Sequence, residues 1–249
     1  MIARPFTLDD PKAAPYLAAY FPLGDPLVPL ARLSAYIAAK VDVVELGLRT
    51  ADPYADGPVI AASMQRSTGA GTLADIRPAM GLLRQVDHAI MGMVFAYATP
   101  ELAAEPSWSD IDAVLCLGKG GSRDRIEDAA VAGGARLTSF VPYDLPAVDV
   151  ERAIRATGFV FLQYTPGPTG LRDATDPVLP RRLARLRAGG ATAPIFAGIG
   201  ISTPDQVRQA LDAGANGVVI GSKTVQKAME GQAALEDYLN EMRAVVNGG

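Results

Sequence analysis

The feature that most limits the fold of this chain is a regular alternation of short apolar segments with longer amphipathic ones. Eight segments are apolar and often β-branched or aromatic, as buried strands are: 16–22, 41–48, 89–96, 113–117, 136–141, 159–164, 194–198 and 217–220. Segments with helical periodicity lie between and after them: 28–39, 58–66, 73–84, 123–132, 148–156, 179–187, 204–213 and 234–246.

Eight such units in 249 residues predict one α/β domain, a (β/α)8 TIM barrel over residues 1–249, with its chemistry in the loops that follow the strands. An open dinucleotide-binding sheet is the alternative fold. No GxGxxG motif follows the first predicted strand, however, which disfavours that sheet.

Charge and hydropathy exclude several classes of partner. A net charge of −4 and a pI near 5.1 leave no basic footprint, so we expect no nucleic-acid partner. No apolar run reaches the ~18 residues that a membrane span needs, and the N-terminus lacks the apolar core of a signal peptide. The sequence therefore predicts a cytoplasmic protein without a membrane partner.

The chain has one cysteine, Cys116, and one histidine, His88. A single cysteine excludes an internal disulfide, and the two residues together disfavour a zinc site or a Ser-His-Asp triad, so we expect no metal. Cys116 lies in an apolar run and is expected to be a buried small hydrophobe. His88 is expected at the end of a strand.

Two carboxylates flank a short polar loop after the second predicted strand. Val41, Val43 and Glu45 fall on one face of a period-two pattern, so Glu45 would point the same way as two valines. A carboxyl group in apolar company has a raised pKa, which suits a general acid or base near neutral pH. Asp56 precedes Gly57 and Pro58, so it is either a second functional carboxylate or the N-cap of the next helix.

Two glycine-containing turns follow the seventh and eighth predicted strands. Glycines let backbone N–H groups approach an anion closely, helix N-termini add positive potential, and barrels often hold phosphate at these two loops. The alternative is that the glycines only permit turns. The predicted phosphate-binding residues are Gly198, Gly200, Gly221 and Ser222.

Four other loops carry weaker signals. Asp25, after the first strand, is expected to be a turn residue or a cap. Segment 99–112 is expected to hold a truncated or irregular helix. Segment 118–122 lacks the GxxxxGK[ST] order of a phosphate-binding loop, and it contributes one cation, Lys119. Segment 165–170, with Arg172 and Asp173 beyond it, is either a lid over the site or an ordinary connection.

Five motifs together resemble the α subunit of tryptophan synthase over nearly the whole chain. They are the LGDP turn after the first strand, ELG followed by DPYADGP, a GPTG loop after the sixth strand, GIGISTPDQV and a terminal IGS. The resemblance implies a TIM barrel that cleaves indole-3-glycerol phosphate to indole and glyceraldehyde 3-phosphate by retro-aldol chemistry, without a metal or an organic cofactor.

The resemblance also implies roles for single residues. Glu45 would be the proton shuttle that protonates carbon 3 of the indole ring and helps to deprotonate the glycerol hydroxyl. Asp56 would lie near the indole N–H and stabilise positive charge on the ring. The residues expected to bind substrate and its phosphate are Gly170, Gly198, Ile199, Gly200, Gly221 and Ser222, with Thr169 closing the loop.

Several segments depart from the family pattern. Arg49-Thr50-Ala51 stands where the family has a Pro-Phe-Ser-like segment, Phe161 and Thr165 replace an expected tyrosine and arginine, and Gly-Lys-Gly-Gly replaces an Asp-Val-Pro segment. The residues expected to complete the substrate pocket are Tyr20, Arg49, Lys119 and Phe161.

These departures leave alternatives open. Arg49 and Lys119 are either solvated or paired with acids such as Asp52, or they bind a negative group that indole-3-glycerol phosphate lacks. The protein could have a tryptophan synthase β subunit as partner or act alone. A related lyase or aldolase for another phosphorylated substrate, or a non-catalytic binding homologue, are the competing functions.

Overall fold

The computed structural model describes residues 15–69, 71–86, 89–118, 120–168 and 176–248. In this part of the chain, nine parallel strands form one sheet in the order β5-β4-β3-β2-β1-β9-β8-β7-β6. The strands are β1 (Tyr16–Pro22), β2 (Val43–Gly47), β3 (Met91–Tyr97), β4 (Ala113–Leu117), β5 (Arg136–Leu137), β6 (Ser139–Val141), β7 (Val160–Gln163), β8 (Ile195–Gly198) and β9 (Gly217–Ile220).

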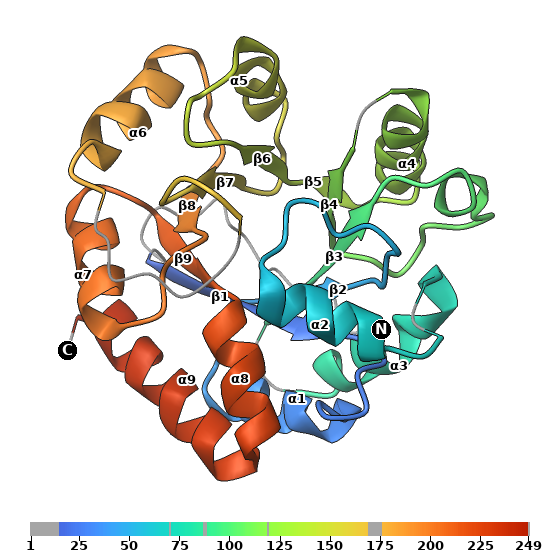
Figure 1. Ribbon diagram of the computed structural model, residues 1–249. Helices are drawn as coiled ribbons and strands as arrows, with labels where there is room; N and C mark the ends of the chain where they lie inside the picture. Colours follow the sequence, from blue (N-terminus) through green and yellow to red (C-terminus); the bar gives the residue numbers. More distant parts are fainter. Residues whose placement is uncertain (1–14, 70, 87–88, 119, 169–175, 249) are drawn as a thin grey trace.

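The predicted TIM barrel is confirmed, with one difference at the fifth strand. Segment 136–141, predicted as one strand, is two short strands separated by Thr138. β5 pairs with β4 and β6 pairs with β7, so this segment changes partner where the barrel closes. Figure 1 shows the strands at the centre with the helices around them.

The helices follow the predicted periodic segments, except that α8 lies outside all eight of them. They are α1 (Leu33–Ala38), α2 (Pro58–Arg66), α3 (Arg77–Leu83), α4 (Gly121–Ala132), α5 (Ala147–Ile154), α6 (Leu179–Ala188), α7 (Pro204–Asp212), α8 (Ser222–Glu230) and α9 (Gln232–Val246). Short 3-10 turns at Leu30–Arg32 and Leu73–Asp75 precede α1 and α3 within the segments predicted as continuous helices. Segment 99–112 contains only the 3-10 turn Leu102–Ala104, as its composition predicted.

Local sequence sets where two helices near the site begin. α2 begins at Pro58 directly after the extended residue Gly57, because proline suits the first helical position. α7 begins after Thr203, whose hydroxyl accepts a hydrogen bond from the backbone N–H of Gln206 at 3.3 Å. The Gln206 side chain in turn accepts hydrogen bonds from the N–H groups of Ser202 and Thr203, which completes a capping box.

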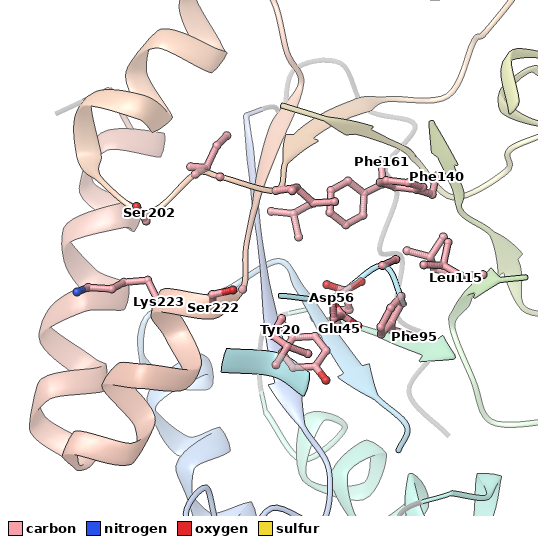
Figure 2. Close-up of a pocket in the computed structure, with 18 residues that line it drawn as sticks. Tyr20, Glu45, Asp56, Phe95, Leu115, Phe140, Phe161, Ser202, Ser222 and Lys223 are labelled. Carbon is pink, nitrogen blue, oxygen red and sulfur yellow. The ribbon is translucent and has the colours of Figure 1, made fainter. Parts of the chain in front are cut away.

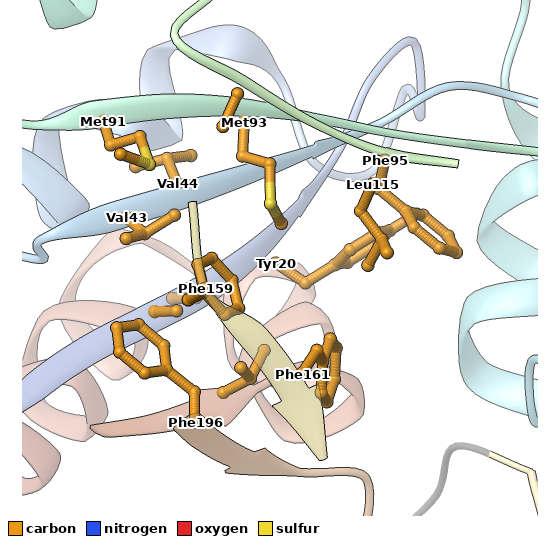
Figure 3. Packing of buried hydrophobic residues seen from close by; sticks show 14 of the residues in the cluster. Tyr20, Val43, Val44, Met91, Met93, Phe95, Leu115, Phe159, Phe161 and Phe196 are labelled. Carbon is orange, nitrogen blue, oxygen red and sulfur yellow. The ribbon is translucent and has the colours of Figure 1, made fainter. Parts of the chain in front are cut away.

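Aromatic side chains fill one end of the barrel interior. Phe196 stacks on Phe159 and on Tyr16, with ring centroids 4.3 and 5.6 Å apart respectively. Tyr16 lies at the start of β1, so this stack closes the end of the barrel where the strands begin. In Figure 3, Phe159 and Phe196 lie at one side of the cluster and Phe95 and Leu115 at the other. An open cavity is therefore expected only toward the carboxyl ends of the strands.

Other predictions outside the site have mixed outcomes. Cys116 is buried in β4, as predicted, and burial raises its pKa to about 12. His88 lies outside the described residues. No helix in the described ranges is long and apolar enough to cross a membrane. Within the same ranges, no cluster of His, Cys, Asp or Glu side chains could hold a metal ion.

Candidate active site

A cavity of about 640 Å³ lies at the carboxyl ends of the strands and is bounded by three kinds of residue. One end is apolar. The opposite end is formed by the loops Ile199–Ser202 and Gly221–Lys223, which follow β8 and β9. Glu45 and Asp56 lie between the two ends, as Figure 2 shows. The side chains of the apolar end include Phe95, Leu115, Phe140 and Phe161.

Glu45 is the middle residue of β2 and is only 4% exposed. It lies in register with Tyr20 on β1 and Met93 on β3, so the sheet fixes its position from both sides. Burial, and to a lesser extent the charge of Asp56, raises the pKa of Glu45 to about 8. This is the direction that its apolar neighbours in the sequence predicted. Glu45 is therefore mostly protonated at neutral pH.

Asp56 lies in the loop between β2 and α2, where it accepts a hydrogen bond of 2.7 Å from the hydroxyl of Tyr97. The N-cap of α2 is Gly57, so Asp56 is not the cap that its neighbours suggested. Tyr97 ends β3 and packs edge-on against Tyr54, with ring centroids 5.0 Å apart. Burial first, then Asp56, raises the pKa of Tyr97, so its hydroxyl keeps its proton and donates.

The loop after β8 is built around close contacts at two glycines. Gly200 has φ +99°, and a Cβ there would lie 2.2 Å from the hydroxyl oxygen of Thr165, so no side chain fits. Thr165 donates a hydrogen bond of 3.0 Å to the carbonyl of Ile199. Gly198 does not line the cavity. A Cβ there would lie 2.5 Å from the ring of Phe161, so Gly198 makes room for that ring.

The loop after β9 offers polar groups to the same end of the cavity. Gly221 is the N-cap of α8, and Ser222 is its first residue. Ser222 is 6% exposed, and within the described part of the chain its hydroxyl has no hydrogen-bond partner. Free N–H groups at a helix start and an unpaired hydroxyl together favour an anion. Lys223 also lines this end of the cavity, although its ammonium group points away from Glu45 and Asp56 in Figure 2.

The remaining predicted residues divide into three groups. Tyr20 and Phe161 line the cavity with the two carboxylates. Arg49 does not; it is exposed and lines a second cavity of about 1030 Å³, which shares Leu117 with the first. No acid among the described residues pairs with Arg49, so the pairing with Asp52 is not seen. The residues that lie outside the described part are Lys119, Thr169, Gly170, Arg172 and Asp173.

Asp25 is more than a turn residue. It accepts a hydrogen bond from the N–H of Leu27 within the turn, as expected, and it also pairs with Arg66 at 2.6 Å and with the hydroxyl of Ser63. Burial opposes ionisation of Asp25, but these bonds outweigh it and lower its pKa. The pair joins the turn after β1 to α2, so Asp25 holds the helix that follows Asp56.

Sequence reasoning missed several residues of the site, including Tyr97, Lys223 and the side chains of the apolar end, Phe95, Leu115 and Phe140. Tyr97 is the residue directly after the predicted strand 89–96, so a boundary one residue longer would have placed it at the carboxyl end of β3. Lys223 directly follows the predicted phosphate-binding residue Ser222 and is the second residue of α8. Its position beside that loop was the signal that could have identified it.

Comparison with known proteins agrees with this architecture. The sequence model of the family described as "Tryptophan synthase alpha chain" matches residues 9–115 and 121–248. The break in the match falls where Gly-Lys-Gly-Gly replaces the expected segment.

Individual relatives cover most of the chain. The tryptophan synthase alpha chain of Geobacter sp. (strain M21) is 34% identical over 84% of this chain and 82% of its own. That of Synechococcus elongatus is 30% identical over 94% of this chain and 90% of its own.

Solved structures share the fold. A chain of Mycobacterium tuberculosis tryptophan synthase has a TM-score of 0.83 at 23% identity, covering 97% of both chains. A mutant alpha-subunit from Pyrococcus furiosus has a TM-score of 0.76 at 22% identity, covering 94% of this chain and 98% of its own. With the family match over most of its length, the chain belongs to the tryptophan synthase alpha chain family.

Proposed function

We propose that the protein is a carbon–carbon lyase that cleaves indole-3-glycerol phosphate to indole and glyceraldehyde 3-phosphate. The observation that carries the proposal is the placement of Glu45 and Asp56 in one cavity but in unlike surroundings. Glu45 is buried, with a pKa near 8, whereas Asp56 accepts a hydrogen bond from Tyr97. Two carboxyl groups in such different environments can act as an acid and as a fixed negative charge.

The proposed reaction uses these two groups in turn. Protonated Glu45 gives its proton to carbon 3 of the indole ring, which leaves positive charge on the ring nitrogen. Asp56 stabilises that charge as a carboxylate beside the N–H. Glu45 then accepts the proton of the glycerol hydroxyl, the bond between the ring and the glycerol carbon breaks, and its electrons restore the aromatic ring. The hydroxyl oxygen becomes the aldehyde oxygen, and Glu45 ends in its starting state.

The shape of the cavity supports a phosphorylated aromatic substrate. Its apolar end presents the rings of Phe95, Phe140 and Phe161, which suit the faces and edges of an indole. Its other end presents the N-terminus of α8 and the buried hydroxyl of Ser222, which suit a phosphate. The carboxyl groups lie between, where the bond to be broken would lie.

The test is indole release from indole-3-glycerol phosphate by the purified chain, with Glu45→Gln as the control variant. Turnover of ~1 s⁻¹ or faster that is lost in Glu45→Gln supports a lyase that acts alone. If the chain alone is inactive, adding a tryptophan synthase β subunit, the proposed partner, distinguishes the remaining cases. Stimulation identifies a partner-dependent α subunit, and continued inactivity contradicts the proposed substrate.

A second candidate is a related lyase or aldolase for another phosphorylated substrate. Two observations favour it. The family match is interrupted at 116–120. Arg49 lines the cavity beside the site, and no acid among the described residues pairs with it. A non-catalytic binding homologue is the third. It predicts that Glu45→Gln keeps ligand affinity and that neither variant nor wild type turns over any substrate.

A further inference from the structure

Two neighbouring polar groups in the cavity lack hydrogen-bond partners within the described residues. Tyr20 is 2% exposed, and its hydroxyl is buried and unpaired. The Glu45 carboxyl likewise makes no hydrogen bond to any described residue. The two residues are register partners on the adjacent strands β1 and β2, and both line the cavity. Adjacent strands lie only ~5 Å apart, so the Glu45 side chain can reach its neighbour by rotation about its own bonds.

The position of the Tyr20 ring is fixed by its surroundings. A Cβ on Gly47 would lie 2.1 Å from the Tyr20 hydroxyl oxygen, so the absence of a side chain at Gly47 is what allows the hydroxyl to lie there. Gly47 follows Glu45 by two residues on the same strand face. Phe95 packs edge-on against the Tyr20 ring, with centroids 6.1 Å apart. Figure 3 shows Tyr20 next to Phe95.

Within the described part of the chain, the other groups near Glu45 do not supply a donor. Met93, its register partner on β3, has none to offer. Asp56 is a second acid, and Tyr97 already donates to Asp56. Lys223 and Ser222 belong to the opposite end of the cavity. A buried carboxylate without a donor is strongly unfavourable, so the transient ionised state of Glu45 needs the neighbouring donor that has no partner in the described structure, the Tyr20 hydroxyl.

We propose that Tyr20 is a positioning residue that donates a hydrogen bond to Glu45 whenever Glu45 is ionised. The hydroxyl hydrogen of tyrosine can point to either side within the plane of the ring. Tyr20 can therefore turn it toward Glu45 after Glu45 has given up its proton, and turn it away when the proton returns. The use of this bond in catalysis rests on the proposed function. The bond itself is a property of the protein without substrate.

The direct test is a ¹³C NMR titration of protein labelled at the glutamate carboxyl carbons, with the Glu45 signal assigned by its loss in Glu45→Gln. Tyr20→Phe should raise the apparent pKa of Glu45 by about one unit, a ten-fold change in its ionisation constant, because the ionised form loses its donor. Tyr238→Phe, which removes the hydroxyl of a buried tyrosine on α9 outside the barrel, should leave that pKa unchanged. An unchanged or lowered pKa in Tyr20→Phe overturns the proposal.

A second measurement needs no variant at Tyr20. In wild-type protein labelled at the tyrosine Cζ carbons, the Tyr20 signal should shift over the same pH range in which Glu45 titrates, and this shift should vanish in Glu45→Gln. A Tyr20 signal that does not respond to Glu45 contradicts the pairing.

Kinetics separate this inference from the proposed function. If indole is released, the pH at which kcat/KM falls should move upward in Tyr20→Phe by the shift that NMR measures, and an unmoved profile overturns the role of Tyr20. If NMR shows the shift but no variant releases indole, the pairing stands and the proposed substrate is wrong. If Glu45-dependent release occurs while NMR shows no shift, the proposed function stands and the role of Tyr20 is wrong.

Discussion

Replacing Glu45 by glutamine should stabilise the protein at neutral and alkaline pH while removing its activity. Glutamine has the shape of a protonated glutamate and carries no charge at any pH. In the folded protein Glu45 resists ionisation, whereas in the unfolded chain it ionises freely. Between the unfolded and the folded pKa, each unit of pH therefore lowers the free energy of unfolding of the wild-type protein, and the glutamine variant lacks this penalty.

The size of the effect follows from the two pKa values. Burial and Asp56 raise the pKa of Glu45 from 4.5 to about 8. The penalty is absent below pH 4.5, grows by roughly 1.4 kcal/mol per unit of pH, and is complete above pH 8. It amounts to about 3 kcal/mol at pH 7 and about 5 kcal/mol above pH 8. Both figures are upper bounds, because structure relaxes around a buried charge.

Urea unfolding at pH 4.5 and at pH 8.5 measures the difference directly. Glu45→Gln and wild type should have similar free energies of unfolding at pH 4.5, and the variant should be the more stable at pH 8.5 by several kcal/mol. Glu101→Gln removes an exposed carboxyl group and serves as the control, with no comparable change between the two pH values. A Glu45→Gln effect that is the same at both pH values would refute the argument that burial opposes ionisation here.

Three further substitutions test separate parts of the site. Tyr97→Phe removes the hydrogen bond to Asp56 and should lower kcat/KM about ten-fold; an unchanged value would mean that Asp56 needs no such support. Gly200→Ala places a side chain against Thr165 at positive φ, so urea unfolding should show a loss of ~1–3 kcal/mol, and KM should rise; a wild-type KM would separate this loop from phosphate binding. Arg49→Ala should change kcat/KM less than about three-fold, since Arg49 lines the neighbouring cavity; a larger loss would favour a substrate with a second negative group.

The sequence predicted the barrel well because the local pattern of apolar residues in each strand and helix shows which of its faces is buried. The strands Tyr16–Pro22, Ala113–Leu117 and Gly217–Ile220 agree with the predicted bounds, since each is an apolar run flanked by turn residues. The start and end of α2 were also predicted, because Pro58 can only open a helix there. The division of segment 136–141 into two strands at Thr138 was not predicted, because it depends on the strands that pair with each half, β4 with β5 and β7 with β6.

The site was predicted less completely, since its residues meet only through the fold. Glu45 was identifiable because the period-two pattern places it beside valines on a strand. The hydrogen bond from Tyr97 to Asp56 joins residues 41 positions apart and has no local signature. Gly198 resembled a phosphate-binding glycine in sequence, yet it does not line the cavity and faces the ring of Phe161. The sequence alone does not distinguish a glycine that makes room for an aromatic ring from a glycine that makes room for a ligand, because the difference lies in the packing.

The contrast between the two carboxyl groups follows from the elements that hold them. A strand in the middle of a parallel sheet gives Glu45 neighbours on both sides and leaves it only 4% exposed, so burial favours the protonated form. Asp56 lies instead in a loop at the carboxyl ends of the strands, where it accepts a hydrogen bond from Tyr97 at the end of β3. The fold therefore places two side chains of the same kind, eleven residues apart in the chain, in unlike surroundings. The stability that Glu45 costs at neutral pH is the direct consequence of keeping that proton available inside the cavity.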